Sequence, residues 1–248
     1  MKQRLFLVLT SLSCCLAAQA GEVTVAVAAN FSAPMQKIAL AFEQDTGHKA
    51  QLAFGATGKF YAQIKNGAPF AVLLAADDET PLRLEKEGLA VAGTRFTYAV
   101  GRLALWSKDS HFVDDKGEIL RSNRFEKLAI ADPKLAPYGA AAMEVMQRMG
   151  LQAQLASKFV QGESIGQTYQ FVSTGNAPLG FVALSQVSFE GRITQGSAWV
   201  VPQNLHTSLK QDAVLLNAGK DNTAALALLK YLQSDAAKTI IRGYGYAL

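Results

Sequence analysis

The sequence predicts an α/β fold with two lobes, each built on a mixed, mainly parallel sheet flanked by helices. Short apolar runs alternate with amphipathic stretches of about 10 to 15 residues along nearly the whole chain, which is typical of parallel strands joined by helices. Two longer strand-like runs, residues 98–106 and 211–216, are not followed at once by a helix, so we expect them to cross between the lobes. Lobe 1 then comprises residues 22–100 and 208–248, and lobe 2 comprises residues 101–207. A single continuous doubly wound sheet is the alternative that periodicity leaves open.

The N-terminus has the features of a cleaved secretory signal. Lys2 and Arg4 form a charged head, residues 5–16 are mostly apolar, and Ala18-Gln19-Ala20 offers a small-x-small cleavage site. We expect cleavage after Ala20, export to the periplasm and a mature chain that begins at Gly21. The apolar run is too short for a membrane anchor, which needs about 20 consecutive apolar residues.

Both cysteines of the sequence, Cys14 and Cys15, lie inside this signal. Either could carry a lipid, but the preceding Ser11-Leu12-Ser13 fits a lipoprotein signal poorly, so we favour simple cleavage. The mature chain then has neither a disulfide nor a cysteine metal site, and its stability depends on its hydrophobic core. Its length suffices for two lobes of about 100 residues each.

Lobe 1 is expected to begin with three strand–helix units. The strands are predicted at residues 23–27, 51–54 and 70–75. The helices that follow them end at Gly47, Asn66-Gly67 and Gly88, because glycine readily adopts the left-handed conformation that closes a helix. The chain returns to this lobe after residue 208 and finishes with helices at residues 222–233 and 235–242.

Lobe 2 shows the same alternation. A strand at residues 128–130 precedes a helix that carries Met143 and Met146 and ends at Gly150. A second strand at residues 158–160 precedes a helix from Ser164 to about Gly175.

Four of the turns between a predicted strand and its helix are small, rich in glycine or hydroxyl residues, and nearly free of charge. They are residues 28–32, 55–58, 136–139 and 162–166. Ligands of open α/β sheets bind beyond the carboxyl ends of the strands. A helix start there offers unpaired N–H groups and about half a positive charge. We therefore interpret the four turns as a binding site for a small anion, although Asn30, Ser32 and Ser164 taken singly are also ordinary helix caps.

A hydrolase is the competing hypothesis from another class of protein. Gly162-Glu163-Ser164-Ile165-Gly166 matches the nucleophile-elbow pattern, and Ser164, Glu190 and His206 follow in the order of a catalytic triad. No His-Gly-Gly oxyanion loop accompanies the pattern. We therefore assign Ser164 to helix capping and expect no catalytic residue.

The charge pattern argues against a nucleic-acid partner. The net charge of +4 includes Lys2 and Arg4 of the signal, and no cluster of Lys and Arg exceeds two neighbours, whereas nucleic-acid binders present a basic stripe. His48, His111 and His206 are far apart in the sequence, so we predict no histidine site for a metal cation.

Several segments together resemble the molybdate/tungstate-binding proteins of bacterial ABC importers, over nearly the whole mature chain. They are Ala29-Asn30-Phe31, Tyr61-Ala62-Gln63-Ile64, Asn66-Gly67-Ala68-Pro69, Ala75-Ala76-Asp77, Arg95-Phe96-Thr97-Tyr98-Ala99, Ala136-Pro137-Tyr138-Gly139 and Ala177-Pro178-Leu179-Gly180-Phe181-Val182. The resemblance implies a two-lobed periplasmic-binding-protein fold of type II that closes on its ligand by a hinge motion. It also implies molybdate or tungstate as the ligand, no cofactor, and an ABC permease with its ATPase as partners of a monomer.

The resemblance places the ligand shell in the same four turns. Carried over position by position, the donors to the oxyanion come from Ala29, Asn30, Thr57, Tyr138 and Ile165. Tyr138 and Ile165 contribute their backbone N–H groups. The chain departs from some relatives at Ala29, where they have a hydroxyl residue, and at Ala183, where they have a tyrosine. Without Arg or Lys in the turns an organic carboxylate is disfavoured, whereas sulfate and phosphate stay open as alternative ligands.

Overall fold

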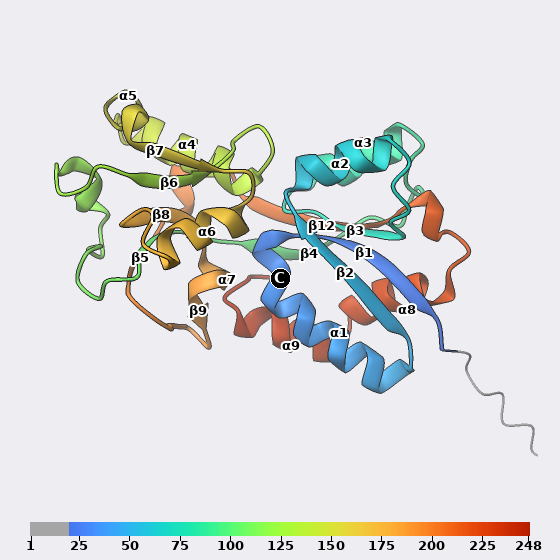
Figure 1. Cartoon of the computed structure of the whole chain (residues 1–248). Helices are drawn as coiled ribbons and strands as arrows, with labels where there is room; N and C mark the ends of the chain where they lie inside the picture. The colour runs from blue at the N-terminus through green and yellow to red at the C-terminus, as the bar shows by residue number, and fades with distance from the viewer. Residues whose placement is uncertain (1–19) are drawn as a thin grey trace, which may run out of the picture.

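The structure is a computed structural model that describes residues 20–248. Residues 1–19 of the predicted signal, with its two cysteines, lie outside the described residues. In the described part the chain forms two five-stranded sheets, each with helices on both faces, and a small two-stranded hairpin (Figure 1). No helix of this part is long and apolar enough to cross a membrane.

The first sheet has the strand order β2-β1-β3-β12-β4. Its strands are β1 (Glu22–Ala28), β2 (Lys49–Gly55), β3 (Val72–Leu74), β4 (Phe96–Gly101) and β12 (Leu209–Leu215). Helices α1 (Ser32–Thr46), α8 (Thr223–Leu232) and α9 (Asp235–Gly243) lie on one face, and α2 (Thr57–Lys65) and α3 (Glu79–Lys86) on the other (Figure 1). Val25 of β1 packs in the core on the α1 side and Ala26 in the core on the α2 side, because successive side chains of a strand point to opposite faces. We call this sheet with its helices half 1.

The second sheet has the order β11-β5-β8-β6-β7. Its strands are β5 (Leu103–Ser107), β6 (Leu128–Ala131), β7 (Phe159–Gly162), β8 (Leu179–Ala183) and β11 (Ser197–Val200). Its core on one side includes residues of α4 (Pro137–Arg148), and its core on the other side includes residues of α6 (Ile165–Ser173). We call this sheet with its helices half 2.

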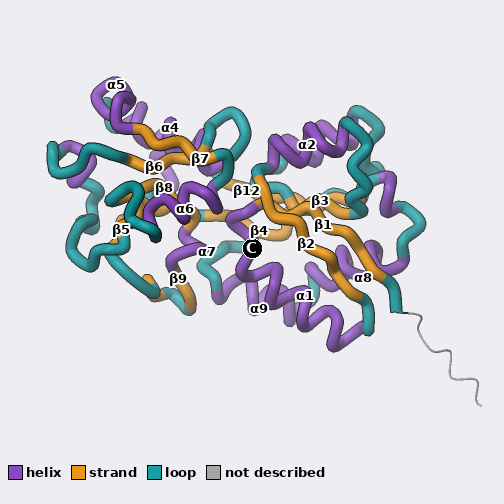
Figure 2. Tube along the Cα trace, viewed as in Figure 1, coloured by secondary structure: helices purple, strands orange, loops and turns teal. Residues whose placement is uncertain are grey.

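Short elements complete the chain (Figure 2). They are α5 (Gln152–Leu155), α7 (Leu184–Val187), the hairpin β9 (Ser188–Phe189) and β10 (Arg192–Ile193), and the 3-10 turns Ala29–Phe31, Glu118–Arg121, Ala156–Lys158, Gln203–Leu205 and Asn217–Gly219.

The predicted strand–helix units are present in both halves, but the run at residues 98–106 is not one strand. It is divided at Arg102 into β4, which belongs to half 1, and β5, which belongs to half 2. Every antiparallel pair of the two large sheets involves β5 or β12. Strand β12, which contains most of the second predicted crossing run, pairs with β3 and β4 of half 1. Strands β5 and β12 make each sheet mixed, whereas the remaining pairs are parallel, as the alternation of strands and helices predicts.

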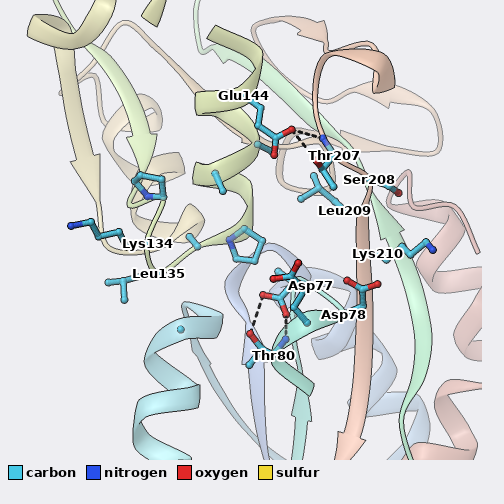
Figure 3. Close-up of a pocket in the computed structure, with 18 residues that line it drawn as sticks. Asp77, Asp78, Thr80, Lys134, Leu135, Glu144, Thr207, Ser208, Leu209 and Lys210 are labelled. Atoms are coloured by element: carbon cyan, nitrogen blue, oxygen red, sulfur yellow. Dashed lines mark hydrogen bonds between the residues drawn. The ribbon is translucent and has the colours of Figure 1, made fainter. Parts of the chain in front are cut away.

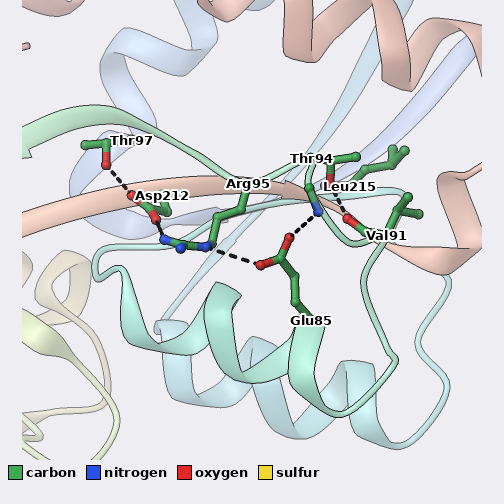
Figure 4. Close-up of polar contacts among 8 residues, drawn as sticks. Glu85, Val91, Thr94, Arg95, Thr97, Asp212 and Leu215 are labelled. Carbon is green, nitrogen blue, oxygen red and sulfur yellow. Dashed lines mark hydrogen bonds and ion pairs between the residues drawn. The ribbon is translucent and has the colours of Figure 1, made fainter.

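Strand β12 is anchored in half 1 through Asp212. The Asp212 carboxylate pairs with the Arg95 guanidinium and accepts a hydrogen bond of 2.6 Å from the Thr97 hydroxyl, while Arg95 also contacts Glu85 of α3 (Figure 4). Opposite this point the register with β4 shifts, so that Tyr98 is an extra residue between the partners of Gln211 and Asp212. Because side chains alternate along a strand, Gln211 points away from this ion pair, and it is fully buried.

Candidate anion-binding site

The five residues predicted for the site line one small cavity between the halves. Ala29, Asn30 and Thr57 come from the turns after β1 and β2, and Tyr138 and Ile165 from the turns after β6 and β7. The cavity is small, with room for about one water molecule. Its lining, taken from the described residues, contains no charged side chain. The structure thus brings together all four turns, as expected for the carboxyl ends of neighbouring parallel strands.

Thr57 is held as a hydrogen-bond donor. It is the first residue of α2 and is buried, and its Oγ1 accepts a hydrogen bond of 2.9 Å from the Ala76 N–H. A hydroxyl has one hydrogen to donate and two lone pairs to accept with. With one lone pair engaged by a backbone N–H, the hydrogen is free to donate to a ligand in the cavity.

Half 2 offers backbone donors instead. Tyr138 is the second residue of α4, after Pro137, and Ile165 is the first residue of α6. The first N–H groups of a helix have no carbonyl within the helix to bind, and the helix dipole makes this end partly positive. Both N–H groups therefore suit an oxyanion. Ala29, with only a methyl side chain, adds no side-chain donor.

Asn30 is buried at the cavity, but its amide hydrogens are engaged elsewhere. Its Nδ2 donates to Gln211 Oε1 at 2.8 Å and to the Tyr246 hydroxyl at 3.0 Å. Its Oδ1 is buried and has no hydrogen-bond partner in the described chain.

Behind Asn30 lies a buried polar cluster that the sequence analysis missed. Gln211 Nε2 donates to the Tyr138 hydroxyl at 3.1 Å, and the Tyr98 hydroxyl lies 3.1 Å from Gln211 Oε1. Burial raises the pKa of the Tyr98 and Tyr138 hydroxyls well above the usual value and that of Tyr246 to about 12. These phenols therefore stay neutral and serve as hydrogen-bonding groups. A glutamine at the head of the apolar run 211–216 was the one signal that pointed to this cluster.

The two halves touch around the cavity. The Gly58 N–H donates to the Leu135 carbonyl at 2.9 Å, and a Cβ at Gly58 would lie 3.1 Å from the Leu135 Cα and O atoms. Ser185 Oγ of half 2 donates to the Asn30 carbonyl at 2.8 Å. Lys59 and Glu163, both exposed, form an ion pair across the same junction.

A larger, open pocket adjoins the cavity and shares Ala76, Ala136 and Pro137 with it (Figure 3). Unlike the cavity, this pocket is charged: its lining includes Asp77, Lys134 and Glu144. Burial raises the pKa of the Asp77 carboxyl to about 6, against hydrogen bonds from Thr80 that favour the carboxylate.

Ser164 has the capping role expected of it. Its Oγ accepts a hydrogen bond of 3.3 Å from the Gln167 N–H at the start of α6. In the described chain no hydrogen bond joins Ser164 to His206 or Glu190. His206 Nδ1 instead lies 2.7 Å from the Thr207 carbonyl, and its buried Nε2 has no partner within residues 20–248.

A family model for bacterial extracellular solute-binding proteins matches residues 23–247. The chain belongs to this family. It is 60% identical to the molybdate-binding protein ModA of Azotobacter vinelandii over 94% of this chain and 92% of the relative. It is 54% identical to ModA of Rhodobacter capsulatus over 93% and 90% of the two chains.

The solved structures agree with this classification. The periplasmic molybdate-binding protein of Azotobacter vinelandii superposes with a TM-score of 0.88 at 36% sequence identity, over 91% of this chain and 99% of that one. The predicted periplasmic-binding-protein fold is confirmed by this match. All three proteins named here are molybdate-binding proteins.

Proposed function

We propose that this protein is the exported receptor of an ABC importer, which captures molybdate or tungstate between two lobes and delivers it to the membrane permease. The observation that carries the proposal is the convergence of four strand-to-helix turns on one uncharged cavity with hydroxyl and N–H donors. The molybdate-binding relatives support the identity of the anion.

The donors suit a dianion that must leave water. The Thr57 hydroxyl and the N–H groups of Tyr138 and Ile165 replace hydration with fixed donors, and each helix start adds about half a positive charge. Asn30 and the backbone at Ala29 complete the proposed shell. None of these groups titrates near neutral pH, so we expect affinity to change little between pH 6 and 8.

Two lobes would close on the anion by a hinge motion. We propose residues 22–100 with 208–248 as lobe 1 and residues 101–207 as lobe 2, with β4, β5 and β12 at the crossings. The backbone contact between Gly58 and Leu135 fits a closed state. The same proposal includes removal of the signal after Ala20, a periplasmic monomer without cofactor or catalytic role, and a permease that works with its own ATPase.

Calorimetric titration of the mature protein with molybdate, tungstate, sulfate and phosphate tests the proposal. At about 100 times the dissociation constant, molybdate or tungstate should stabilise the protein by roughly 2.7 kcal/mol, which raises the melting temperature by about 5 to 11 °C for a chain of this size. Preferential binding of sulfate or phosphate would assign the receptor to another anion, and indifference to all four would refute an oxyanion receptor.

The variant Thr57→Val tests whether the Thr57 hydroxyl binds the anion. Valine keeps the shape of threonine and removes one donor to a charged acceptor, worth about 1.5 to 3 kcal/mol or roughly tenfold to a hundredfold in affinity. Thr239→Val, on the exposed side of α9, is the matched control and should bind as the wild type does. Full affinity in Thr57→Val would remove this turn from the ligand shell.

A further inference from the structure

The Asn30 amide has the wrong polarity for an anion. Its two hydrogens are engaged by Gln211 and Tyr246, and the end left over is the buried acceptor Oδ1, which has no partner in the part of the chain described. A buried polar atom without a partner is destabilising, and a lone pair repels an oxyanion. Asn30 lines the cavity, and the end of its amide that is left without a partner is an acceptor rather than a donor.

If the Asn30 and Gln211 side-chain amides both rotate by about 180°, Asn30 presents a donor instead of an acceptor. We call this joint rotation the turnover of the two amides. The oxygen and nitrogen of an amide exchange places when it turns, so the contacts of 2.8 Å and 3.1 Å keep their lengths. Gln211 Nε2 then donates to Asn30 Oδ1, and the Tyr138 hydroxyl donates to Gln211 Oε1. The Tyr98 hydroxyl accepts from Gln211 and still donates to the Ala75 carbonyl at 2.9 Å. The Tyr246 hydroxyl, which accepts from Asn30 Nδ2 before the change, must then donate its one hydrogen to Asn30 Oδ1. The Asn30 carbonyl, to which Tyr246 donated, keeps the Ser185 hydroxyl as its donor. An Asn30 N–H is then left for the ligand.

We propose that Gln211 is a positioning residue of the anion site: it sets the polarity of the Asn30 amide, and the two amides turn over together when the anion binds. The inference rests on the proposed function, since it concerns how the same cavity recognises its anion. Gln211 lies on β12 of half 1 and bonds Asn30 of half 1 and Tyr138 of half 2, so the turnover depends on both halves being in contact.

The surrounding structure suits an amide at position 211. Only a side chain with both a donor and an acceptor end can serve Asn30 and Tyr138 in either polarity, which excludes a carboxylate. Space for the cluster is made at Gly101, where a Cβ would lie 2.1 Å from the Tyr138 Oη and 2.4 Å from Gln211 Nε2. Any larger residue at Gly101 would displace this pair.

The polarity of Asn30 also determines which anions fit. With its N–H toward the ligand the shell holds donors alone, which suits molybdate, tungstate and sulfate because they are fully deprotonated at neutral pH. Inorganic phosphate carries at least one proton there and needs an acceptor, which Asn30 supplies only before it turns over. Gln211 thus acts as a specificity determinant against protonated oxyanions.

A double-mutant cycle with molybdate tests whether Gln211 acts through Asn30. Gln211→Met should raise the dissociation constant about tenfold in the wild-type background and less than about twofold in Asn30→Ala, where no amide is left to position. Lys210→Met, exposed on the same strand, is the control and should leave affinity unchanged. An equal loss in both backgrounds, or no loss in either, would overturn the proposal, whereas a wild type that ignores molybdate would refute the proposed function instead.

A second measurement needs no variant. In the molybdate-bound protein, nuclear Overhauser contacts of the Gln211 Nε2 protons should reach the Tyr98 ring and not the Tyr138 ring. Contacts to the Tyr138 ring would show that the amides have not turned over. In the same preparation, phosphate at 100 times the molybdate dissociation constant should displace no molybdate, and displacement would overturn the assigned specificity.

Discussion

The two halves of the cavity present donors of different kinds. In the proposed ligand shell half 1 contributes side chains, the Thr57 hydroxyl and the Asn30 amide, whereas half 2 contributes backbone N–H groups at Tyr138 and Ile165. A side-chain donor depends on the identity of the residue, but a backbone donor depends only on the path of the chain. Equivalent strand-to-helix turns can therefore respond very differently to substitution.

The supporting contacts differ in the same way. Half 1 needs other groups to orient its side chains: the Ala76 N–H for Thr57, and Gln211 for Asn30. Half 2 needs α4 to lie close against β6, which Gly139 permits, since a Cβ there would lie 2.3 Å from the Ala131 carbonyl oxygen. Half 1 should be sensitive at its polar residues and half 2 at its glycines.

The sharpest test of this comparison substitutes the donors of half 1. Asn30→Ala combined with Thr57→Val removes two hydrogen bonds to a charged ligand, so the molybdate dissociation constant should rise by about a hundredfold or more. Ile165→Val, which keeps the backbone N–H of half 2, should change it by less than about threefold. Calorimetric titration of both variants with molybdate measures the two dissociation constants. Similar losses of affinity in the two variants would show that the halves do not differ in their sensitivity to substitution.

A second prediction concerns Asp77, a side chain of half 1 beside the cavity. Its pKa is about 6 in the fold against a usual value of 3.8, so between these values the folded protein binds more protons than the unfolded chain. The contribution of the Asp77 carboxyl to the free energy of unfolding therefore falls as the pH rises from about 4 to 6, by up to about 3 kcal/mol, and stays constant at higher pH.

Asp77→Asn removes this titration and keeps an acceptor for the Thr80 N–H. The gain in unfolding free energy over the wild type should be near zero at pH 4 and should grow toward pH 7, as measured by urea unfolding. Glu126→Gln, which removes an exposed carboxylate that does not act on Asp77, serves as the control. A gain that is the same at every pH would contradict the burial of the Asp77 charge.

Half 2 should be sensitive at Gly139. In Gly139→Ala the new methyl group meets the backbone of β6, so α4 must shift, and we expect a loss of about 1 to 3 kcal/mol in stability together with weaker molybdate binding. In Gly243→Ala the added Cβ meets only the Phe189 ring at 3.6 Å, so this control should melt near the wild type. If Gly139→Ala is destabilised but binds molybdate with normal affinity, then binding does not depend on the position of α4.

The smallest effect is expected at the ion pair between Lys59 and Glu163, which joins the halves at the surface. Exposed pairs contribute about 0.2 to 1 kcal/mol, so Lys59→Met should weaken molybdate binding by less than about fivefold, and less still at high salt. Lys65→Met, on the same helix, is the control. A loss above tenfold would mean that this pair, rather than the backbone contact of Gly58 with Leu135, holds the halves together.

Much of the site could be predicted because its signals are local. A strand of apolar residues, a small turn and an amphipathic helix stand within about 20 consecutive residues, and each of the four turns carries its own donors. The same locality explains what was missed. Strands β8 and β11 have no such pattern around them, and the division of β4 from β5 at Arg102 depends on which sheet each strand joins.

The sequence by itself determined the order of the strand–helix units, their ends at residues such as Gly47 and Gly150, and the four turns that face one edge. Only the tertiary structure decided that Gln211 lies against Asn30, 181 residues away in the chain, and that Tyr246 near the C-terminus joins them. Helix and turn signals arise from neighbours in sequence, whereas these hydrogen bonds exist because sheet register and the packing of two halves bring distant strands together. For that reason the turns that line the cavity could be predicted, whereas the side chains that bond Asn30 could not.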